Sequence, residues 1–410
     1  MLTSSVSQNS STDVSEKKNG PYWWERFLFF LPLIRVTLLM RRNAEGYAVI
    51  DVFSLVEIAA MFLIGIYLLT VLHKIPWRKL FGSCMGWLLI YYVFCIFSFI
   101  WRAPGSSAPY IIYRAVSMNI MILYVFYLMS RFRDQKEAFD RLLKYVFLIL
   151  LLGFFGEFKS RGFAFGSLHT NSYSFSAAVL AVLAMTAFKI QEKTFSQVKW
   201  YVILGMVGIL LGTSGGSNIA FAMAFCFIMC VNKEQLNPLL VLLLPIVGIL
   251  IYAFFLPEIM QFLFPGKTMA GIRSGTGRMK MWEVYINAWK EYPWLGYGFC
   301  IGERSGHLFG YRYTLSAHNG YISVLVNTGI AGVFFFGLFV LSWFFSQLKQ
   351  MSMRNRNIYP VIAAFIVIMV NNMSVPTIGS QWSALSTIVL LVGSYFALYC
   401  QNPPPKKSFR

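Results

Sequence analysis

Residues 271–332 read GIRSGTGRMKMWEVYINAWKEYPWLGYGFCIGERSGHLFGYRYTLSAHNGYISVLVNTGIAG. This is the longest polar interruption in an otherwise apolar chain. It contains two of the four histidines, His307 and His318, together with four arginines. Apolar segments of spanning length lie on both sides of it, so we interpret it as a large loop between membrane helices.

Its first half, residues 278–292, has the periodicity of an amphipathic helix, with Trp282, Tyr285, Trp289 and Tyr292 on one stripe. Such a helix is predicted to lie flat at the lipid headgroups. Pro293 ends it, and the glycines of PWLGYG allow a tight turn. A second helix is predicted to begin near Ser316, with His318 and Asn319 in its first turn. There the helix dipole favours a neutral imidazole that can accept a proton.

The composition places the whole chain in a membrane. Of its 410 residues, 57% are hydrophobic and 12% are charged, which is typical of a polytopic membrane protein. A formal charge of +19 would suggest a nucleic-acid partner for a soluble protein. Here the basic residues are expected in cytoplasmic loops that face anionic lipid, so membrane lipids are the predicted partner and nucleic acid is not.

Windows of about 20 residues predict an all-α protein with about twelve transmembrane helices and one large loop that carries the amphipathic helix. The spans are at about 22–40, 49–72, 83–101, 109–129, 141–157, 171–188, 198–213, 215–231, 237–256, 318–346, 358–376 and 380–400. The first contains Arg35 and precedes Arg41 and Arg42, so an interfacial helix is the alternative there.

Basic connections alternate with poorly charged ones, which predicts that both termini are cytoplasmic. The predicted order is a disordered cytoplasmic tail at 1–21, membrane helices at 22–256, a periplasmic or extracellular loop at 257–317, membrane helices at 318–400 and a cytoplasmic tail at 401–410. The loop has seven basic and four acidic residues, against the trend for external loops. Its charges therefore favour an anionic ligand at the outer membrane surface.

Three motifs in this stretch resemble one family. They are GR-x-x-x-W (Gly277, Arg278, Trp282), P-x-L-G-x-G (residues 293–298), and HN-x-Y with two later glycines (His318, Asn319, Tyr321, Gly329, Gly332). Together they resemble the O-antigen ligases and polymerases, which are bacterial membrane glycosyltransferases. GSLHTNSYS around Asn171 is similar to a second family signature. TSGGSN at 213–218 departs from the family's Ser-Arg-Gly, which leaves one diphosphate-binding arginine unaccounted for.

The resemblance implies transfer of a surface glycan from an undecaprenyl-diphosphate carrier to a sugar hydroxyl, with inversion, at the outer face of the bacterial inner membrane. The acceptor would be a lipid A core sugar for a ligase or another lipid-linked repeat unit for a polymerase, in lipopolysaccharide, capsule or exopolysaccharide synthesis. His318 would be the general base and Arg278 would bind the diphosphate. The expected substrate-binding residues are Arg273, Arg312, Arg114, Trp282, Asn319, Tyr321, His169 and Asn171.

Other interpretations of these residues stay open. His318 would serve equally as a helix-end hydrogen-bonding group, and Arg278 as a residue that reaches the headgroups. The asparagines at helix ends, including Asn371 and Asn372, would either line a cavity or join helices. The loop contains no Asp, so we expect a reaction without a metal or cofactor. A transporter or flippase for a lipid-linked saccharide is the alternative function, although internal repeats are not evident.

Overall fold

The structure is a computed structural model that describes residues 20–38, 52–104, 106–154, 170–190, 192–212, 214–231, 278–302 and 317–401. Nearly all of the two predicted tails, the span at 237–256 and most of the loop at 257–317 lie outside the described residues. The described residues fold into helices joined by short turns, as the apolar sequence predicts for an all-α protein.

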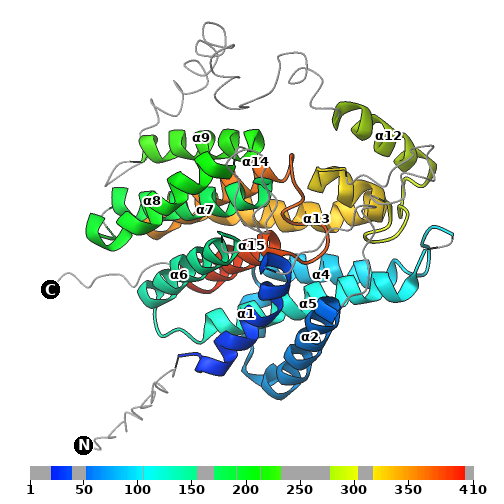
Figure 1. The fold of residues 1–410 in the computed structure, drawn as a ribbon, viewed down its shortest axis with the longest axis horizontal. Coiled ribbons are helices and arrows are strands. Elements are labelled where there is room, and N and C mark those ends of the chain that lie inside the picture. The colour runs from blue at the N-terminus through cyan, green and yellow to red at the C-terminus, as the bar shows by residue number, and fades with distance from the viewer. Residues whose placement is uncertain are drawn as a thin grey trace, which may run out of the picture.

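The elements run in chain order as a bundle of helices (Figure 1). They are α1 (Trp23–Leu38), α2 (Val52–Val71), η1 (Leu72–Lys74), α3 (Trp77–Phe81), α4 (Cys84–Phe97), α5 (Ala108–Ser130), α6 (Gln135–Phe154), α7 (Thr170–Lys189), α8 (Phe195–Gly212), α9 (Gly215–Cys230), α12 (Arg278–Glu291), α13 (Gly320–Ser352), η5 (Arg356–Ile358), α14 (Tyr359–Asn371), α15 (Ala384–Tyr395) and η6 (Phe396–Cys400).

Within the described ranges, five helical segments are long and apolar enough to cross a membrane. They are Leu55–Lys74, Ala108–Ser130, Asn171–Lys189, Phe195–Gly212 and Gly320–Ser352. Four shorter apolar helices, Cys84–Phe97, Gly215–Cys230, Arg356–Asn371 and Ala384–Cys400, match four further predicted spans. The predicted spans at 22–40 and 141–157 correspond to α1 and α6, which do not belong to either group. The count of twelve therefore stays a prediction.

Helix α1, which corresponds to the first predicted span, is held in place by a buried carboxylate. The described part of α1 has 16 residues, fewer than the roughly 20 that a perpendicular span needs. Its Glu25 is fully buried, and its carboxylate accepts hydrogen bonds from the hydroxyls of Tyr67 on α2 and Tyr127 on α5. A buried carboxylate needs such donors, so Glu25 fastens α1 to these two helices.

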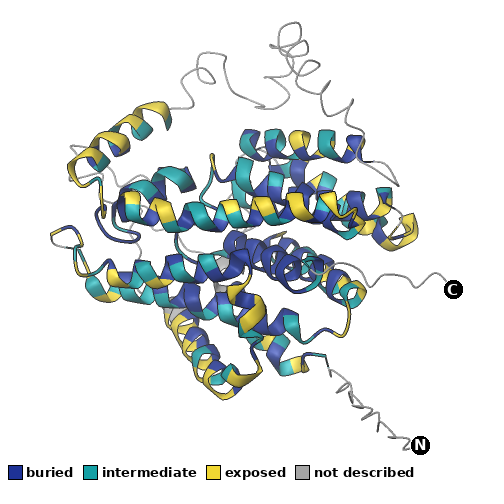
Figure 2. Cartoon of the chain, turned by 180° about the vertical axis from the view of Figure 1, so that it is seen from behind, coloured by how far each residue is buried: buried dark blue, intermediate teal, exposed yellow. Residues whose placement is uncertain are grey.

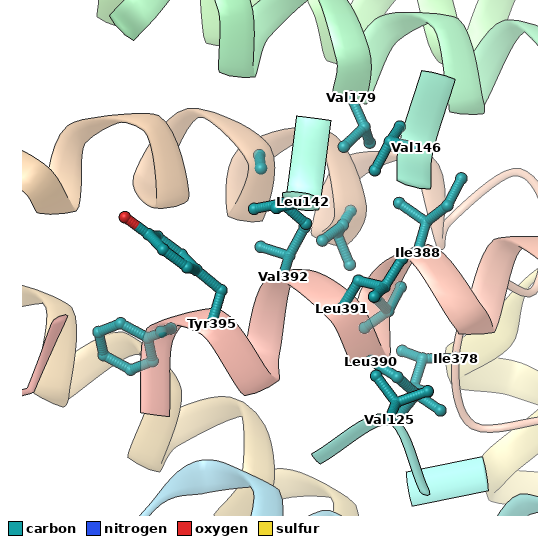
Figure 3. Close-up of a cluster of buried hydrophobic side chains, with 14 of the residues drawn as sticks. Val125, Leu142, Val146, Val179, Ile378, Ile388, Leu390, Leu391, Val392 and Tyr395 are labelled. Atoms are coloured by element: carbon teal, nitrogen blue, oxygen red, sulfur yellow. The ribbon is translucent and has the colours of Figure 1, made fainter. Parts of the chain in front are cut away.

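The centre of the bundle is α15, whose twelve residues are all buried. Figure 3 shows its Ile388 and Val392 among Leu142 and Val146 of α6 and Val179 of α7. A helix that is apolar all round is expected in such a central place. On the outside, α2 exposes Leu55, Phe62 and Leu69, and Figure 2 shows the corresponding row of exposed residues. An apolar outer face on a helix of spanning length is what contact with lipid requires.

Candidate active site

The amphipathic helix predicted in the polar stretch is α12, and its stripe packs against protein. Figure 1 shows α12 at one end of the bundle, close to the start of α13. Tyr285 and Ala288 are buried in a small cluster with Ala317 and Val326 of the α13 region. The polar face is exposed, as predicted, at Lys280, Glu283, Asn287, Lys290 and Glu291. Tyr292 departs from the prediction because it follows the helix and is 54% exposed.

The turn after α12, residues 293–298, fits into a break in α13. Gly329 has φ 61° and ψ −163°, which interrupts the helix. In a continuous helix, Ile330 N would donate to Val326 O and Ala331 N to Asn327 O. The turn supplies all four groups with other partners. These bonds are Tyr297 N to Val326 O (3.0 Å), Gly298 N to Asn327 O (2.9 Å), Ile330 N to Pro293 O (2.8 Å) and Ala331 N to Trp294 O (3.0 Å).

Two glycines make this close approach possible. A Cβ at Gly329 would lie 2.4 Å from the carbonyl carbon and oxygen of Trp294. A Cβ at Gly296, where φ is +67°, would lie 2.5 Å from Val326 O. Both contacts are with backbone atoms, which cannot swing aside as a flexible side chain can. The glycines of the P-x-L-G-x-G and later motifs therefore have a structural reason: they let two backbone segments meet.

The same turn is also tied to the connection between α4 and α5. The indole Nε1 of Trp101 donates to Leu295 O (2.8 Å), and Ala103 N donates to Tyr297 O (2.8 Å). The 293–298 turn thus joins α12, the broken α13 and the α4–α5 connection through backbone hydrogen bonds. We call this assembly the backbone frame.

His318 lies just before α13, within residues 317–320, which we call the His318 turn. The prediction that the helix begins near Ser316 is wrong, because the N-cap is Asn319 and the helix begins at Gly320. The Asn319 Oδ1 accepts hydrogen bonds from Tyr321 N (2.9 Å) and Ile322 N (3.2 Å). His318 is therefore outside the first helical turn. It is half-buried and has φ 47°, a left-handed conformation that is uncommon for a residue other than glycine.

Two long-range bonds hold the His318 turn on either side of the imidazole. On one side, the indole Nε1 of Trp282 on α12 donates to Ala317 O (2.9 Å). On the other side, Gly320 N donates to Asn372 O at the end of α14 (2.7 Å). Strained backbone of this kind persists where the surroundings determine it, and it is concentrated at functional sites. His318 is thus presented in one fixed conformation by two other helices.

A series of uncharged polar groups extends from the His318 turn across the ends of α14, α9 and α7. The Ser217 Oγ of α9 donates to Asn371 Oδ1 (2.8 Å) and contacts Asn171 O at the start of α7 (3.5 Å). Asn372 continues the series to Gly320. We call Asn171, Ser217, Asn371 and Asn372 the polar seam. Asn171 and His318, which are far apart in the sequence, therefore belong to one end of the bundle.

Arg278 is the first residue of α12 and is half-buried. No carboxylate of the described residues forms an ion pair with it. Burial lowers the pKa of its guanidinium, since the charged form loses solvation. A cation in this position gains most from an anionic partner that restores the lost solvation.

Residues 200–337 match the family model described as O-antigen ligase. This segment is similar to the O-antigen ligases. It contains α9, α12, the 293–298 turn, the break in α13 and the His318 turn. A search of curated proteins found no match. The resemblance read from the motifs is thus confirmed for residues 200–337, while α14, which supplies Asn371 and Asn372, lies beyond the matched residues.

The other predicted site residues fall into three groups. Trp282 and Asn319 hold backbone in the His318 turn, and the Tyr321 hydroxyl donates to Met369 O of α14 (3.0 Å). Arg114 is paired with Glu57 of α2, at 3.2 Å between Nη1 and Oε1. Arg273, Arg312 and His169 lie outside the described residues. Among the residues that the structure describes, no three His, Cys, Asp or Glu side chains are grouped as a metal site would require.

Two features of the structure differ from the sequence-based expectations. The ion pair of Arg114 with Glu57 is one of them, and an acidic residue within a predicted span is the sequence signal that points to such a pair. The break at Gly329 is the other, because the sequence predicts one continuous span at 318–346. Asn371 and Asn372 are expected either to line a cavity or to join helices. Two of their oxygens join helices, since Asn371 Oδ1 accepts a hydrogen bond from Ser217 of α9 and Asn372 O accepts one from Gly320 N of α13.

Proposed function

We propose that this protein transfers a glycan from an undecaprenyl-diphosphate carrier to a sugar hydroxyl at the outer face of the bacterial inner membrane. His318 acts as the general base, and Arg278 contacts the diphosphate. The acceptor is a lipid A core sugar if the protein is a ligase, or another lipid-linked repeat unit if it is a polymerase. The active site faces the periplasm, and the reaction uses neither metal nor cofactor.

One observation carries this proposal: the fixed presentation of His318. The residue before His318 accepts a hydrogen bond from Trp282 through its backbone oxygen. Two residues after His318, the backbone nitrogen of Gly320 donates to Asn372 O. A residue that only capped the helix would not need this arrangement, because Asn319 already caps α13. A general base must be held within hydrogen-bonding reach of the proton that it removes. The hydrogen bonds on both sides of His318 fix the backbone from which its imidazole extends, which supports this role.

In the proposed reaction, the acceptor hydroxyl gives its proton to the neutral imidazole of His318 while its oxygen attacks the anomeric carbon. The bond from that carbon to the diphosphate oxygen breaks, and the electron pair leaves with the carrier diphosphate. A single displacement of this kind inverts the anomeric configuration. The Arg278 guanidinium stabilises the negative charge that develops on the leaving diphosphate. A guanidinium suits this task because its fork of donors matches phosphate oxygens.

A transporter for the same lipid-linked saccharide is the alternative, and one observation bears on it. Broken helices are common in transporters, where the freed backbone groups coordinate the cargo. The break in α13 differs, because the 293–298 turn takes up the freed carbonyls of Val326 and Asn327. These groups are therefore not available to a cargo. The break instead serves to fix the turn, which favours the enzyme.

The test compares His318→Ala with His73→Ala in a deletion strain. His73 is exposed in η1, remote from the His318 turn, and is the matched control. We expect His318→Ala to lose transfer by about 10²- to 10⁴-fold, the usual contribution of a general base, at normal abundance in the membrane. His73→Ala should restore transfer fully.

A polysaccharide gel of the same strain separates the two acceptors. Lipid A core that carries a single repeat unit identifies a polymerase, and polymer that stays on the carrier lipid identifies a ligase. If His318→Ala transferred glycan as well as His73→Ala, the general-base assignment would be wrong.

A further inference from the structure

Asn371 and Asn372, at the end of α14, carry amide NH₂ groups whose hydrogen-bonding capacity the described residues do not fully use. Both side chains are fully buried. Neither Nδ2 atom forms a hydrogen bond of normal geometry with the described residues. A buried donor without an acceptor lowers stability, so native proteins keep few of them, often for a functional reason. We call these two side chains the amide pair.

The orientation of the Asn372 amide is fixed by its neighbours. Its Oδ1 accepts hydrogen bonds from Thr377 N (2.8 Å), Ile378 N (3.2 Å) and the Thr377 hydroxyl (3.0 Å). Two of these donors are backbone N–H groups, which cannot accept a hydrogen bond. The atom that faces them must therefore be the oxygen. The unused atom of Asn372 is consequently its NH₂ group.

The amide pair lies next to the His318 turn. A Cβ added to Gly320 would lie 2.2 Å from Asn372 Oδ1 and 2.5 Å from Nδ2, so the amide stands directly against the first residue of α13. His318 is two residues away in the chain. The Tyr321 hydroxyl donates its own proton to Met369 O (3.0 Å), and its oxygen faces the Asn372 amide, where it is in place to accept from one of the two N–H groups. Asn371 precedes Asn372 in the chain, and its Oδ1 accepts a hydrogen bond from the Ser217 hydroxyl of α9 (2.8 Å).

The surroundings of the amide pair decide the kind of ligand. The described side chains that hydrogen-bond to the pair's side-chain amides, those of Ser217, Thr377 and Tyr321, are uncharged. The unused groups are donors, so they require an oxygen acceptor. A phosphate would be better served by a cation such as Arg278, which is on α12. A set of neutral amides instead suits the hydroxyl and ring oxygens of a sugar.

We propose that the amide pair, Asn371 and Asn372, binds sugar oxygens of the glycan beside His318. The assignment rests on the proposed function and adds a division of roles: cationic residues bind the diphosphate, and the amide pair reads the sugar. The sugar belongs either to the donor glycan or to the acceptor, which share this chemistry. The unused donors are then satisfied when substrate is bound.

The test uses Asn372→Asp in the full-length protein. An aspartate keeps the oxygen that accepts from Thr377 and Ile378, because backbone N–H donors stabilise a carboxylate, and it replaces the NH₂ group by an acceptor oxygen that carries negative charge. The matched control is Asn119→Asp. The Asn119 Nδ2 donates to Ala115 O within α5 (2.9 Å), so the same chemical change there removes a donor that is already used.

Binding is measured in lipid nanodiscs, with His318→Ala present in every sample so that bound donor is not consumed. One probe is the lipid-linked glycan that accumulates in a strain lacking this protein, and the other is undecaprenyl diphosphate without sugar. If the amide pair reads the donor sugar, Asn372→Asp should weaken binding of the glycan-bearing lipid about tenfold, the effect of one lost hydrogen bond. Binding of the bare diphosphate lipid should not change.

The acceptor is tested in the active chain at saturating donor. An increase of about tenfold in the KM for acceptor in Asn372→Asp, with donor binding unchanged, would assign the amide pair to the acceptor sugar. If Asn372→Asp does not fold, the pair Ser217→Ala with Asn371→Leu makes the same test, since it removes the other donor together with its partner.

The proposal is overturned if neither donor discrimination nor acceptor KM responds, or if binding of both lipids weakens equally. Failure of the proposed function looks different. In that case the His318→Ala protein binds neither lipid before any amide is changed, and the assignment of the amide pair falls with it.

Discussion

Gly329→Ala tests the backbone frame most directly. The added Cβ would lie 2.4 Å from two backbone atoms of Trp294, so the 293–298 turn and α13 must separate. The φ of 61° with ψ of −163° is a conformation that glycine adopts almost alone. Alanine therefore opposes the break in two independent ways, through sterics and through backbone strain.

The magnitude follows from the hydrogen bonds at stake. Four bonds join the turn to the break, and each has a net value of about 1 kcal/mol. Losing all of them would lower the free energy of unfolding by about 4 kcal/mol. If α13 instead closed into a continuous helix, Ile330 N and Ala331 N would regain helical acceptors, and the loss would be roughly half as large. In either case the frame no longer fixes the turn against α13, and transfer should fall.

The assay is thermal unfolding in detergent, followed with a thiol-reactive fluorophore. Cys84, Cys95, Cys300 and Cys400 are buried in the folded protein and react only when it opens. We expect Gly329→Ala to lower Tm by at least about 3 °C. The control is Gly337→Ala on the same helix, where nothing lies within 4 Å of the added Cβ. Helix propensity predicts that this control is up to about 1 kcal/mol more stable.

The reasoning would be refuted if Gly329→Ala melted together with Gly337→Ala and retained full transfer. That result would mean that the break in α13 does not depend on glycine and that the frame contributes little to the site.

Three further predictions use the same region. Trp282→Phe keeps an aromatic ring but loses the hydrogen bond to the His318 turn, so kcat should fall about tenfold at unchanged KM. The control is Trp289→Phe, which loses a hydrogen bond to the turn after α12 and should change kcat less. Arg278→Lys keeps the charge without the planar fork, so donor binding and turnover should both fall, in contrast to Lys280→Ala on the exposed face of the same helix. Trp294 is 70% exposed, and a cysteine in its place should react with a membrane-impermeant reagent in intact cells stripped of outer membrane; labelling only after lysis would reverse the predicted topology.

Local patterns in the sequence were sufficient for the features that local forces decide. The helix predicted at 278–292 is α12 at Arg278–Glu291, because a 3.6-residue period and a following proline determine where a helix forms and ends. The apolar segments identify helices because hydrogen bonds within a helix satisfy its own backbone. The glycines of PWLGYG predict a turn because glycine adopts positive φ without steric cost. Gly296 and Gly298 both have positive φ in the structure.

What the sequence did not predict depends on contacts between distant segments. Ser316 and Asn319 are both good N-cap residues, and local preference does not choose between them. The choice of Asn319 places Gly320 N against Asn372 O, 52 positions further along the chain. A single glycine is tolerated in a helix, so NTGIAG reads as continuous. The break at Gly329 becomes favourable only when the 293–298 turn is present to take its hydrogen bonds.

Most of the motif residues hold backbone segments in place, so they do not explain which sugar is recognised. Trp282, Asn319 and Gly329 each fix a segment of chain, so the motifs are largely instructions for presenting His318. Hydrogen bonds between backbone groups are the same whatever sugar is transferred, and they cannot distinguish one glycan from another. Specificity requires side-chain donors or acceptors that the protein leaves unused. In the described part of the chain, two donors of this kind belong to Asn371 and Asn372, at the end of a helix outside the matched segment. The segment that presents His318 matches a family, and the two asparagines proposed to bind the sugar lie outside it. This division would let the same chemistry serve different glycans.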